Sequence, residues 1–337
     1  MRLLFVKLKH IGDSLLLTPT LMAVRRQYPQ ASIWVVVRKG SEGILSGCPA
    51  VDELRTAVAP EAEKRPFWNW WTDLRLICEL RRRRFDYAFE LTDGDRGRWV
   101  TVLSGARTRC VNTAVSPLNL WWRRRFNAGS QFVWVNRHRA EKDFYTVRDC
   151  LPLDGPIPPL AFDRAHTALW PGAQSMSDFA LLHPATRWQR KAWPVEKWRE
   201  LGVHLLRRVP HLVISGGPER GEIELANGLA GALGDRAVSC AGQLSWAQLA
   251  GLLYQARLFV GVDTAAMHLA AACQCPTVAI FGPSVVNQWR PWHVPHRIVT
   301  PPDALRLTSE EKLTQRVETS AVIQACAEML AAGRVAQ

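Results

Sequence analysis

Three residues that could carry out chemistry, Asp13, Lys191 and Asp263, follow short apolar runs of the chain. Residues 2–8 and 258–262 are such runs, and their apolar, β-rich composition predicts buried strands. Ligands of parallel α/β sheets bind beyond the carboxyl ends of the strands, where these three residues stand. A carboxylate there can accept a proton from a hydroxyl group, and an ammonium group can stabilise charge on a phosphate. We therefore expect these residues to take part in binding or catalysis.

A purely structural role fits both aspartates equally well. Residues 265–273 are predicted as a helix that ends before a proline, and residues 277–281 as the next strand. Asp263 or Thr264 could cap this helix, because both side chains accept hydrogen bonds from free first-turn N–H groups. The same N–H groups and the helix dipole suit a phosphate. Capping and a functional role therefore both remain open for Asp13 and for Asp263.

A loop in the second half of the chain carries cations in a position that suits a diphosphate. Thr186, Arg187 and Lys191 come after a predicted strand at residues 179–183 and before a predicted helix at residues 195–208. Cationic side chains make strong hydrogen bonds to phosphate oxygens. We therefore predict that this loop binds a diphosphate.

A glycine turn at residues 216–219 follows a predicted strand at residues 211–215 and opens another helix. A glutamate near such a turn commonly accepts hydrogen bonds from ribose hydroxyl groups, and Glu219 and Glu222 both fit this role. The alternative is a first-turn acid that the helix dipole favours. The sequence does not choose between the two glutamates.

The fold class follows from the alternation of short strands and helices, which is typical of a parallel α/β sheet. Strands are predicted in the first half at residues 2–8, 32–37 and 85–91. A length of 337 residues suggests two domains, and the prolines between residues 151 and 171 indicate a connection between them. The predicted parts are a first domain at 1–160, a second domain at 161–308, and an amphipathic C-terminal helix in 309–337 that packs back toward the first domain.

The positive charge of the chain is concentrated in its first half. The net charge is +13, and residues 1–150 hold 26 Lys and Arg against 15 Asp and Glu, whereas the remainder holds 17 against 15. The first half is therefore expected to face nucleic acid, an acidic membrane or a phosphorylated substrate.

Charged residues interrupt the N-terminal apolar run, so we expect no secretory signal. The eight cysteines show no metal-ligand spacing, which favours free thiols in a reducing cytoplasm.

Two segments of the first half, residues 65–71 and 121–126, combine tryptophan with arginine. Such residues favour the membrane–water interface, where the rings are half buried and the cations meet lipid phosphate. Stacking of nucleic-acid bases on the rings and burial of the rings in the core are the alternatives. We favour an interfacial or acceptor-facing role for both segments. The residues concerned are Phe67, Trp68, Trp70, Trp71, Trp121, Trp122, Arg123, Arg124 and Arg125.

Four motifs in chain order resemble glycosyltransferase family nine, the ADP-heptose:lipopolysaccharide heptosyltransferases. They are KHIGDSLLLTP at 9–19, TRWQRKAW at 186–193, GGPE at 216–219 and GVDTAAMH at 261–268. The resemblance covers nearly the whole chain. The second motif and QWRPW at 288–292 are most similar to the third inner-core heptosyltransferase, which branches heptose from heptose. Ala265 is a departure, since family members usually have glycine there and a methyl group limits approach to a phosphate.

The resemblance implies a GT-B arrangement of two Rossmann-like domains facing across a cleft, with the acceptor on the first and the donor on the second. It implies an inverting, single-displacement transfer from ADP-heptose without a metal or other cofactor. Asp13 would be the general base, and Lys191 would stabilise the departing diphosphate. The implied donor-binding residues are Thr186, Arg187, Lys191, Gly217, Glu219, Glu222, Asp263, Thr264 and His268. Lys9 would lie on the acceptor side.

The implied partners are an ADP-sugar donor, the anionic lipopolysaccharide core and the cytoplasmic face of the inner membrane, where the protein would be peripheral; nucleic acid is not expected. The only Asp-x-Asp sequence in a loop, at residues 93–95, lies in the proposed acceptor half, so it does not suggest a metal site at the donor.

A nucleotide-sugar epimerase of the same architecture is the enzymatic alternative. A nucleic-acid-binding protein is the non-catalytic alternative, although the near-neutral second half does not favour it.

Overall fold

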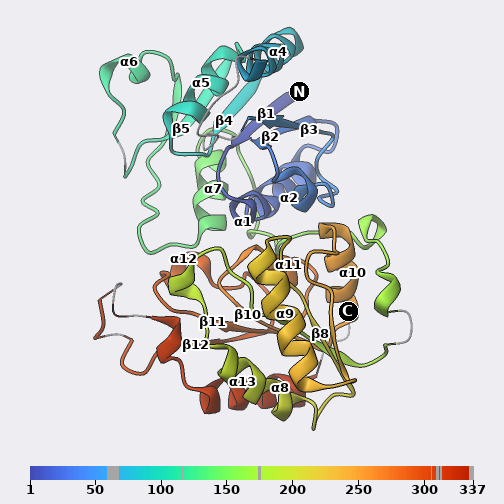
Figure 1. Ribbon diagram of the computed structural model, residues 1–337. Coiled ribbons are helices and arrows are strands. Elements are labelled where there is room, and N and C mark those ends of the chain that lie inside the picture. The colour runs from blue at the N-terminus through green and yellow to red at the C-terminus, as the bar shows by residue number, and fades with distance from the viewer. Residues whose placement is uncertain are drawn as a thin grey trace. The chain divides into compact units, whose positions relative to one another are not determined.

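The computed structural model of the chain divides into two compact units, Met1–Ala161 and Phe162–Gln337 (Figure 1). The division falls one residue from the boundary predicted at residue 160 and inside the proline-rich connection. The structure describes residues 1–58, 68–115, 117–173, 176–304, 306–308, 311 and 313–333, with the backbone alone at 68–70. No helix in these ranges combines the length and the apolarity needed to cross a membrane.

The first unit is built on a parallel six-stranded sheet in the order β3-β2-β1-β4-β5-β6. Its apolar strands are buried on both faces, as is usual for parallel sheets with helices on each side. The strands are β1 (Arg2–Lys7), β2 (Ser32–Arg38), β3 (Glu53–Ala57), β4 (Tyr87–Glu90), β5 (Thr108–Asn112) and β6 (Ala128–Ser130). The chain passes from β1 to β2 and β3 on one side and returns to β4 on the other, so the strand order reverses between β1 and β4.

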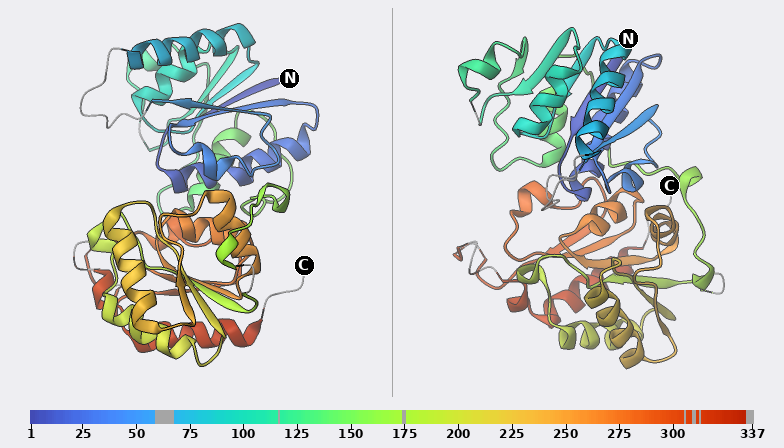
Figure 2. Two further views of the ribbon diagram at one scale, coloured as in Figure 1. Left: turned by 45° about the vertical axis from the view of Figure 1, so that its right-hand side comes forward. Right: turned by 45° about the horizontal axis from the view of Figure 1, so that its top comes forward.

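Helices cover both faces of this sheet (Figure 2). Alternate residues of β1 point to opposite faces. Leu3 and Phe5 pack in one apolar cluster with α2 and α7, whereas Leu4 and Val6 pack in another with α4 and α5. The helices are α1 (Ile11–Leu15), α2 (Thr18–Gln27), α3 (Glu42–Leu45), α4 (Trp68–Arg83), α5 (Asp95–Leu103), α6 (Leu120–Arg123) and α7 (Arg139–Arg148).

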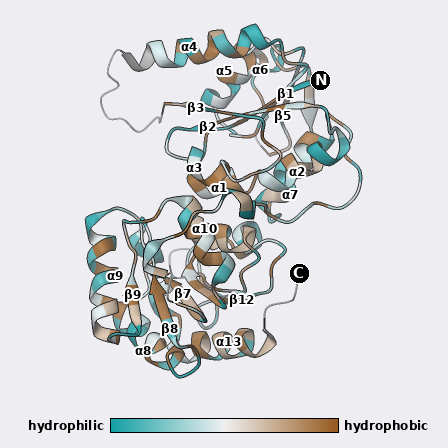
Figure 3. Ribbon diagram, turned by 90° about the vertical axis from the view of Figure 1, so that its right-hand side faces the viewer, coloured by the Kyte–Doolittle hydropathy of each residue, from teal (hydrophilic) through white to brown (hydrophobic). Residues whose placement is uncertain are grey.

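The second unit repeats this plan with a parallel sheet in the order β12-β11-β10-β7-β8-β9. The predicted strands at 179–183 and 258–262 are confirmed as β7 and β10, and the apolar character of β7 and β8 is visible in Figure 3. The strands are β7 (Phe179–His183), β8 (His211–Ile214), β9 (Ala237–Ser239), β10 (Leu258–Val262), β11 (Thr277–Ile280) and β12 (His296–Val299). Here the strand order reverses between β7 and β10.

The helices of the second unit also lie on both faces of its sheet. Trp198 of α8, Leu229 of α9 and Val322 of α13 pack in one cluster, while α10 and α11 contact each other and the strands β7 and β10. The helices are α8 (Val195–Leu205), α9 (Arg220–Leu233), α10 (Trp246–Gln255), α11 (Ala265–Ala272), α12 (Val286–Trp289) and α13 (Thr319–Ala332). Short 3-10 turns are η1 (Arg164–His166), η2 (Pro171–Ala173), η3 (Gln189–Lys191) and η4 (Thr314–Arg316).

The C-terminal helix is shorter than the sequence predicts, because α13 begins at Thr319 and η4 precedes it. Residues 309, 310, 312 and 334–337 of the predicted segment lie outside the described residues. The helix packs on α8 and on β10, β11 and β12. The chain before it is fastened by Trp193, whose Nε1 donates to the carbonyl oxygen of Val317 at 3.0 Å. These contacts place α13 on the second unit, and its packing toward the first domain stays a prediction.

Candidate functional site

Asp13 lies in the first turn of α1, directly after β1 and at the point where the order of the first sheet reverses. Its side chain is only 6% exposed. The N-cap of α1 is His10, and no side chain makes a capping hydrogen bond there. The structure therefore contradicts the capping alternative for Asp13. Its position beyond the carboxyl end of β1 is the position in which ligand-binding residues of such sheets are found.

A buried lysine provides the charge next to Asp13. Lys7 is the last residue of β1, and its Nζ lies 2.9 and 2.7 Å from the two carboxylate oxygens of Asp143 on α7. Burial acts to lower the pKa of Lys7, but the carboxylates of Asp143 and Asp13 outweigh it and raise the pKa above its usual value. Lys7 is therefore a fixed positive charge close to Asp13, and the sequence motifs did not indicate it.

A second ionic group surrounds Asp93, which follows β4. Its Oδ2 accepts a hydrogen bond from Lys9 Nζ at 2.9 Å and another from Lys142 Nζ. Burial opposes ionisation of Asp93, but the charges of Lys142 and Lys9 hold its pKa well below the usual range. Burial and the nearby Lys7 charge lower the pKa of Lys142 to about 8. Lys9, predicted on the acceptor side, thus lies in a cluster with Asp93 at this edge.

Both aspartates of the Asp-x-Asp sequence at residues 93–95 accept hydrogen bonds from neighbouring side chains. Asp93 binds the two lysines, and Oδ1 of Asp95 accepts from Arg98 at 2.9 Å and from Trp122 Nε1 at 3.1 Å. Within the described residues, no group of three His, Cys, Asp or Glu side chains could hold a metal ion. None of the eight cysteines forms a disulfide, which agrees with the predicted thiols.

Glu90, the last residue of β4, is a further buried acid that sequence reasoning missed. Its carboxylate accepts hydrogen bonds from the backbone N–H groups of Thr92 at 2.8 Å and Asp93 at 3.3 Å. Burial, followed by the negative charge of Asp93, raises the pKa of Glu90 to about 7. Gly97 is required beside it, because a Cβ at this position would collide with Oε1 of Glu90. Glu90 therefore fixes the turn that carries Asp93.

The structure brings together Lys191 and Asp263, which are 72 residues apart in the sequence. Lys191 Nζ lies 2.6 Å from Oδ2 of Asp263 and 3.4 Å from its carbonyl oxygen. Lys191 ends η3, and Asp263 follows β10, so the pair stands at the reversal point of the second sheet. The N-cap of α11 is Thr264, and no side chain caps this helix. Asp263 therefore orients the ammonium group of Lys191 and is not a cap.

Thr264 is the N-cap of α11, has an extended backbone and directly follows Asp263. Its Oγ1 is buried and has no hydrogen-bond partner in the part of the chain that the structure describes. A buried hydroxyl group without a partner is costly unless a ligand satisfies it. Ala265 occupies the first helical position, and His268, one turn further, is buried with its ring 6.5 Å from that of Trp289.

The glycine turn at residues 216–219 and the start of α9 carry one anchored glutamate and one exposed glutamate. Oε2 of Glu222 accepts from the backbone N–H of Gly217 at 2.6 Å. A Cβ at Gly217 would collide with that oxygen, so the present position of the Glu222 carboxylate depends on glycine there. Glu219 is exposed and is the N-cap of α9, although its side chain makes no capping hydrogen bond.

The loop that is predicted to bind a diphosphate runs from β7 to η3. Thr186 accepts a hydrogen bond from the backbone N–H of Trp188 at 3.3 Å, and Arg187 is exposed. His183 at the end of β7 is a residue that the sequence analysis missed. Its Nδ1 lies 2.9 Å from the hydroxyl oxygen of Ser215, and burial lowers its pKa to about 4. His183 therefore remains a neutral hydrogen-bonding group at neutral pH.

The tryptophan–arginine segments divide between core and surface. Trp122 is buried with Val111, Leu118 and Phe126, so its predicted interfacial role is wrong: the ring fills a small apolar cluster between β5 and α6. Trp121 is 39% exposed, with the guanidinium carbon of Arg125 3.3 Å from its ring centroid. Trp71 is 52% exposed, and Arg123 and Arg124 are exposed. Phe67 and the side chains of Trp68 and Trp70 lie outside the described residues.

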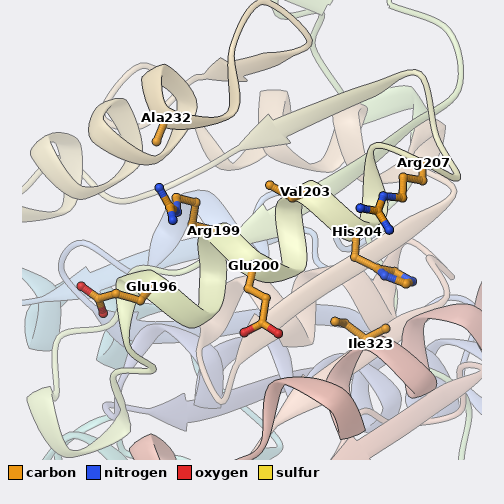
Figure 4. Close-up of a pocket in the computed structure, with 8 residues that line it drawn as sticks. All are labelled: Glu196, Arg199, Glu200, Val203, His204, Arg207, Ala232 and Ile323. Atoms are coloured by element: carbon orange, nitrogen blue, oxygen red, sulfur yellow. The ribbon is translucent and has the colours of Figure 1, made fainter.

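A cavity of about 760 Å³ lies on the outer side of α8, away from the residues described above (Figure 4). Acidic and basic side chains of α8 face it, together with Ala232 of α9 and Ile323 of α13. None of the predicted donor residues lines it. The candidate site of the second unit is therefore the carboxyl edge of its sheet.

Comparisons with known proteins agree with the sequence motifs. A family model described as Glycosyltransferase family 9 (heptosyltransferase) matches residues 74–315. The chain is 27% identical over 292 residues to lipopolysaccharide heptosyltransferase 3 of Escherichia coli, with 83% of each chain covered. It is 31% identical over 300 residues to lipopolysaccharide heptosyltransferase 1 of Pseudomonas aeruginosa, with 84% of this chain and 79% of the relative covered.

Solved structures share the fold. The E. coli heptosyltransferase WaaC with ADP aligns with a TM-score of 0.82 at 21% identity, covering 98% of this chain and 100% of that chain. The predicted α/β fold of the GT-B class is thus confirmed. A structure described as a UDP-N-acetylglucosamine 2-epimerase from Listeria monocytogenes is more distant, with a TM-score of 0.52, 11% identity, and 98% and 88% of the two chains covered. The family match over residues 74–315, with the 31% identity above, shows that this chain belongs to glycosyltransferase family 9.

Proposed function

We propose that the protein transfers heptose from ADP-L-glycero-D-manno-heptose to a heptose of the lipopolysaccharide inner core, with inversion at the anomeric carbon. Family membership and similarity to lipopolysaccharide heptosyltransferase 3 support the substrate class. The observation that carries the proposal is the Lys191–Asp263 pair beside the buried, unpartnered hydroxyl group of Thr264. This arrangement provides a cation, a hydroxyl group and a helix N-terminus for one anionic group.

The donor diphosphate would bind to the edge of the second sheet. Lys191 and Arg187 provide positive charge, and Thr186, Thr264 and the first-turn N–H groups of α11 provide hydrogen-bond donors. An unpaired carboxylate would repel a diphosphate, but the carboxylate of Asp263 is paired with Lys191. The role of Asp263 is therefore to position the ammonium group of Lys191. Glu222 is the better placed of the two glutamates for the ribose hydroxyls, because its hydrogen bond to Gly217 holds it at the turn. His268 lies within the first turns of the same α11.

The acceptor would be activated by Asp13 as general base. Its carboxylate takes the proton of the acceptor hydroxyl while the hydroxyl oxygen forms a bond to the anomeric carbon. The bond from that carbon to the diphosphate oxygen breaks in the same step, and ADP leaves with the electron pair. Lys7, held by Asp143, balances the negative charge of Asp13 before the proton arrives. Lys191 and Arg187 balance the charge on the departing diphosphate.

Because these cations supply the charge that a metal ion would otherwise supply, we propose that the transfer needs no metal or other cofactor. EDTA is therefore expected to leave the turnover of the purified protein unchanged. The measurement is the rate of ADP release with and without the chelator, followed by addition of Mg²⁺. A loss of activity that Mg²⁺ restores would contradict the metal-free mechanism.

The lipid-linked acceptor would be met at the cytoplasmic face of the inner membrane, where the protein would be peripheral. The exposed Trp71, Trp121, Arg123 and Arg124 support this proposal, because aromatic rings and arginines favour an anionic interface. Tryptophan and arginine could also bind nucleic acid. We do not favour that alternative, because it does not explain the proposed donor-binding residues, which lie in the near-neutral second half.

Vesicle flotation tests the membrane proposal. Binding to anionic vesicles is expected to exceed binding to neutral vesicles and to weaken with salt. The double substitution Trp71→Ala and Trp121→Ala should reduce binding. Trp188→Ala is the matched control, because Trp188 is 51% exposed beside an arginine but lies in the second unit. Equal binding to both kinds of vesicle would contradict the proposal.

A direct assay tests the proposed activity as a whole. The purified protein is incubated with ADP-heptose and a heptose-terminated core oligosaccharide, and ADP release and the mass of the product are followed. We expect ADP and an oligosaccharide that is one heptose heavier in equal amounts. Conversion of the nucleotide sugar without transfer to the oligosaccharide would favour the epimerase alternative.

A further inference from the structure

A cavity of about 410 Å³ lies between α4 and α5, on one face of the first sheet. The two helices contact each other and lie side by side in Figures 1 and 2. The apolar lining comes from Leu76, Ile77, Trp99, Val100 and Leu103. This volume lies in the range of small-molecule sites, which are typically about 300–1,000 Å³ and mostly apolar.

The two charged residues of the lining form an ion pair with each other. Arg96 of α5 forms an ion pair with Asp73 of α4, with 3.3 Å between the guanidinium nitrogen and the carboxylate oxygen. These residues stand one helical turn before Ile77 on α4 and Val100 on α5. The cavity therefore has one charged end and an otherwise apolar wall, which suits a chain of methylene groups below a polar head.

The rim of the cavity continues into an exposed apolar surface. Trp99 and Leu103 are 44% and 38% exposed, and Leu74 on the neighbouring helix is also exposed. The ring of Trp99 lies 4.9 Å from that of Trp121, so the aromatic surface extends from α5 to α6. Contiguous exposed apolar patches on a protein surface often mark interaction sites.

The charge of the segment that carries this surface indicates what binds there. Residues 68–125, which carry α4, α5 and α6, contain twelve arginines, no lysine and six acidic residues, and Arg96 lines the cavity itself. Arginine binds phosphate through two parallel hydrogen bonds, and tryptophan with arginine favours the lipid–water boundary. The apolar cavity, its aromatic rim and the arginine-rich segment that carries them together match a phosphorylated lipid.

We propose that the cavity between α4 and α5 binds one fatty acyl chain of the lipid that carries the acceptor saccharide. The part of this inference that concerns the acceptor rests on the proposed function. The acyl chain would lie against Ile77, Val100 and Leu103, and the surrounding arginines would meet lipid phosphates. The cavity is thus an acceptor-binding site separate from the reacting hydroxyl group.

Two substitutions alter the cavity in different ways. Ile77→Trp fills it from α4, and Leu103→Glu places a negative charge at its rim. Leu169→Glu is the matched control, because Leu169 is 71% exposed and belongs to the second unit. None of these residues belongs to the proposed catalytic or donor-binding groups. Circular dichroism and the melting temperature establish that each variant is folded before binding is measured.

Binding of cis-parinaric acid, a fatty acid that fluoresces in apolar surroundings, tests the cavity without using activity. The native protein and Leu169→Glu are expected to show one saturable site. Ile77→Trp and Leu103→Glu are expected to bind about tenfold more weakly or worse, which corresponds to losing about two buried methylene groups. If the native protein shows no saturable site, or if both cavity variants bind as the native protein does, the inference is overturned.

The kinetics of transfer then test whether the chain belongs to the acceptor. With the acylated acceptor, the cavity variants are expected to raise KM about tenfold and to leave kcat unchanged. With the deacylated core oligosaccharide, they are expected to match the native protein. An equal effect on both acceptors would overturn the assignment to the acceptor lipid. Site-specific binding of cis-parinaric acid by a protein that transfers no heptose would instead refute the proposed function and leave the cavity as a fatty-acyl site.

Discussion

Asp13→Asn is expected to lower turnover by about 10²-fold or more, while the melting temperature and the affinity for ADP stay close to those of the native protein. The reason is that Asn keeps the shape of the side chain but has no basic oxygen that can take the acceptor proton. The structure removes the main structural objection, because Asp13 is not the N-cap of α1 and makes no capping hydrogen bond.

The matched control for Asp13→Asn is Asp143→Asn, which removes a neighbouring carboxylate with a different role. Asp143 is fully buried and holds the ammonium group of Lys7, so its loss leaves a buried charge without its main partner. Breaking such a pair typically costs about 3–5 kcal/mol of folding free energy. We therefore expect a lower melting temperature for Asp143→Asn but not for Asp13→Asn. Near-native turnover in Asp13→Asn would refute its role as the base.

Lys191→Ala is expected to reduce turnover by about 10²–10³-fold, because it removes a cation that stabilises the departing diphosphate. It also leaves the nearly buried carboxylate of Asp263 without its ion-pair partner. The double variant Lys191→Ala with Asp263→Ala removes both charges and separates these effects. It should regain stability relative to Lys191→Ala but should not regain turnover.

Arg190→Ala is the matched control for Lys191→Ala, since Arg190 is the neighbouring cation in η3 and is exposed over the ring of Trp188. We expect its folding free energy to change by no more than about 0.5 kcal/mol, as is usual for a surface substitution, and its turnover to stay close to the native value. Stopped-flow measurement of ADP release compares the variants. Native turnover in Lys191→Ala, or equal losses in Lys191→Ala and Arg190→Ala, would contradict the assigned role.

The sequence predicts best where a segment is uniformly apolar and has clear ends. Residues 258–262 and 265–273 are examples: a glycine-containing apolar run is confirmed as β10, and α11 ends within one residue of the prediction. Strands β3, β5, β6 and β12 were not predicted. Strands β3 and β12 lie at sheet edges, contain charged residues and are less buried, so their composition resembles that of loops, and β6 has only three residues.

In the candidate site, single residues could be selected from the local sequence, but contacts between distant residues could not be predicted. Asp263 and Lys191 could be selected because each follows a strand, although their contact could not be predicted over 72 residues. The buried pair of Lys7 and Asp143 spans 136 residues, and the only local signal was a lysine at the end of an apolar strand. Trp122 was misassigned because a tryptophan beside arginines has the same composition in a core as at an interface.

The central claim, transfer of heptose to the lipopolysaccharide core, is tested most directly by mass spectrometry of a reconstituted reaction. Lipopolysaccharide is isolated from a strain that lacks this protein and is incubated with the purified protein and ADP-heptose. We predict that the core gains one heptose unit with the native protein and none with Asp13→Asn. An unchanged core mass with the native protein, or an equal gain with Asp13→Asn, would contradict the account.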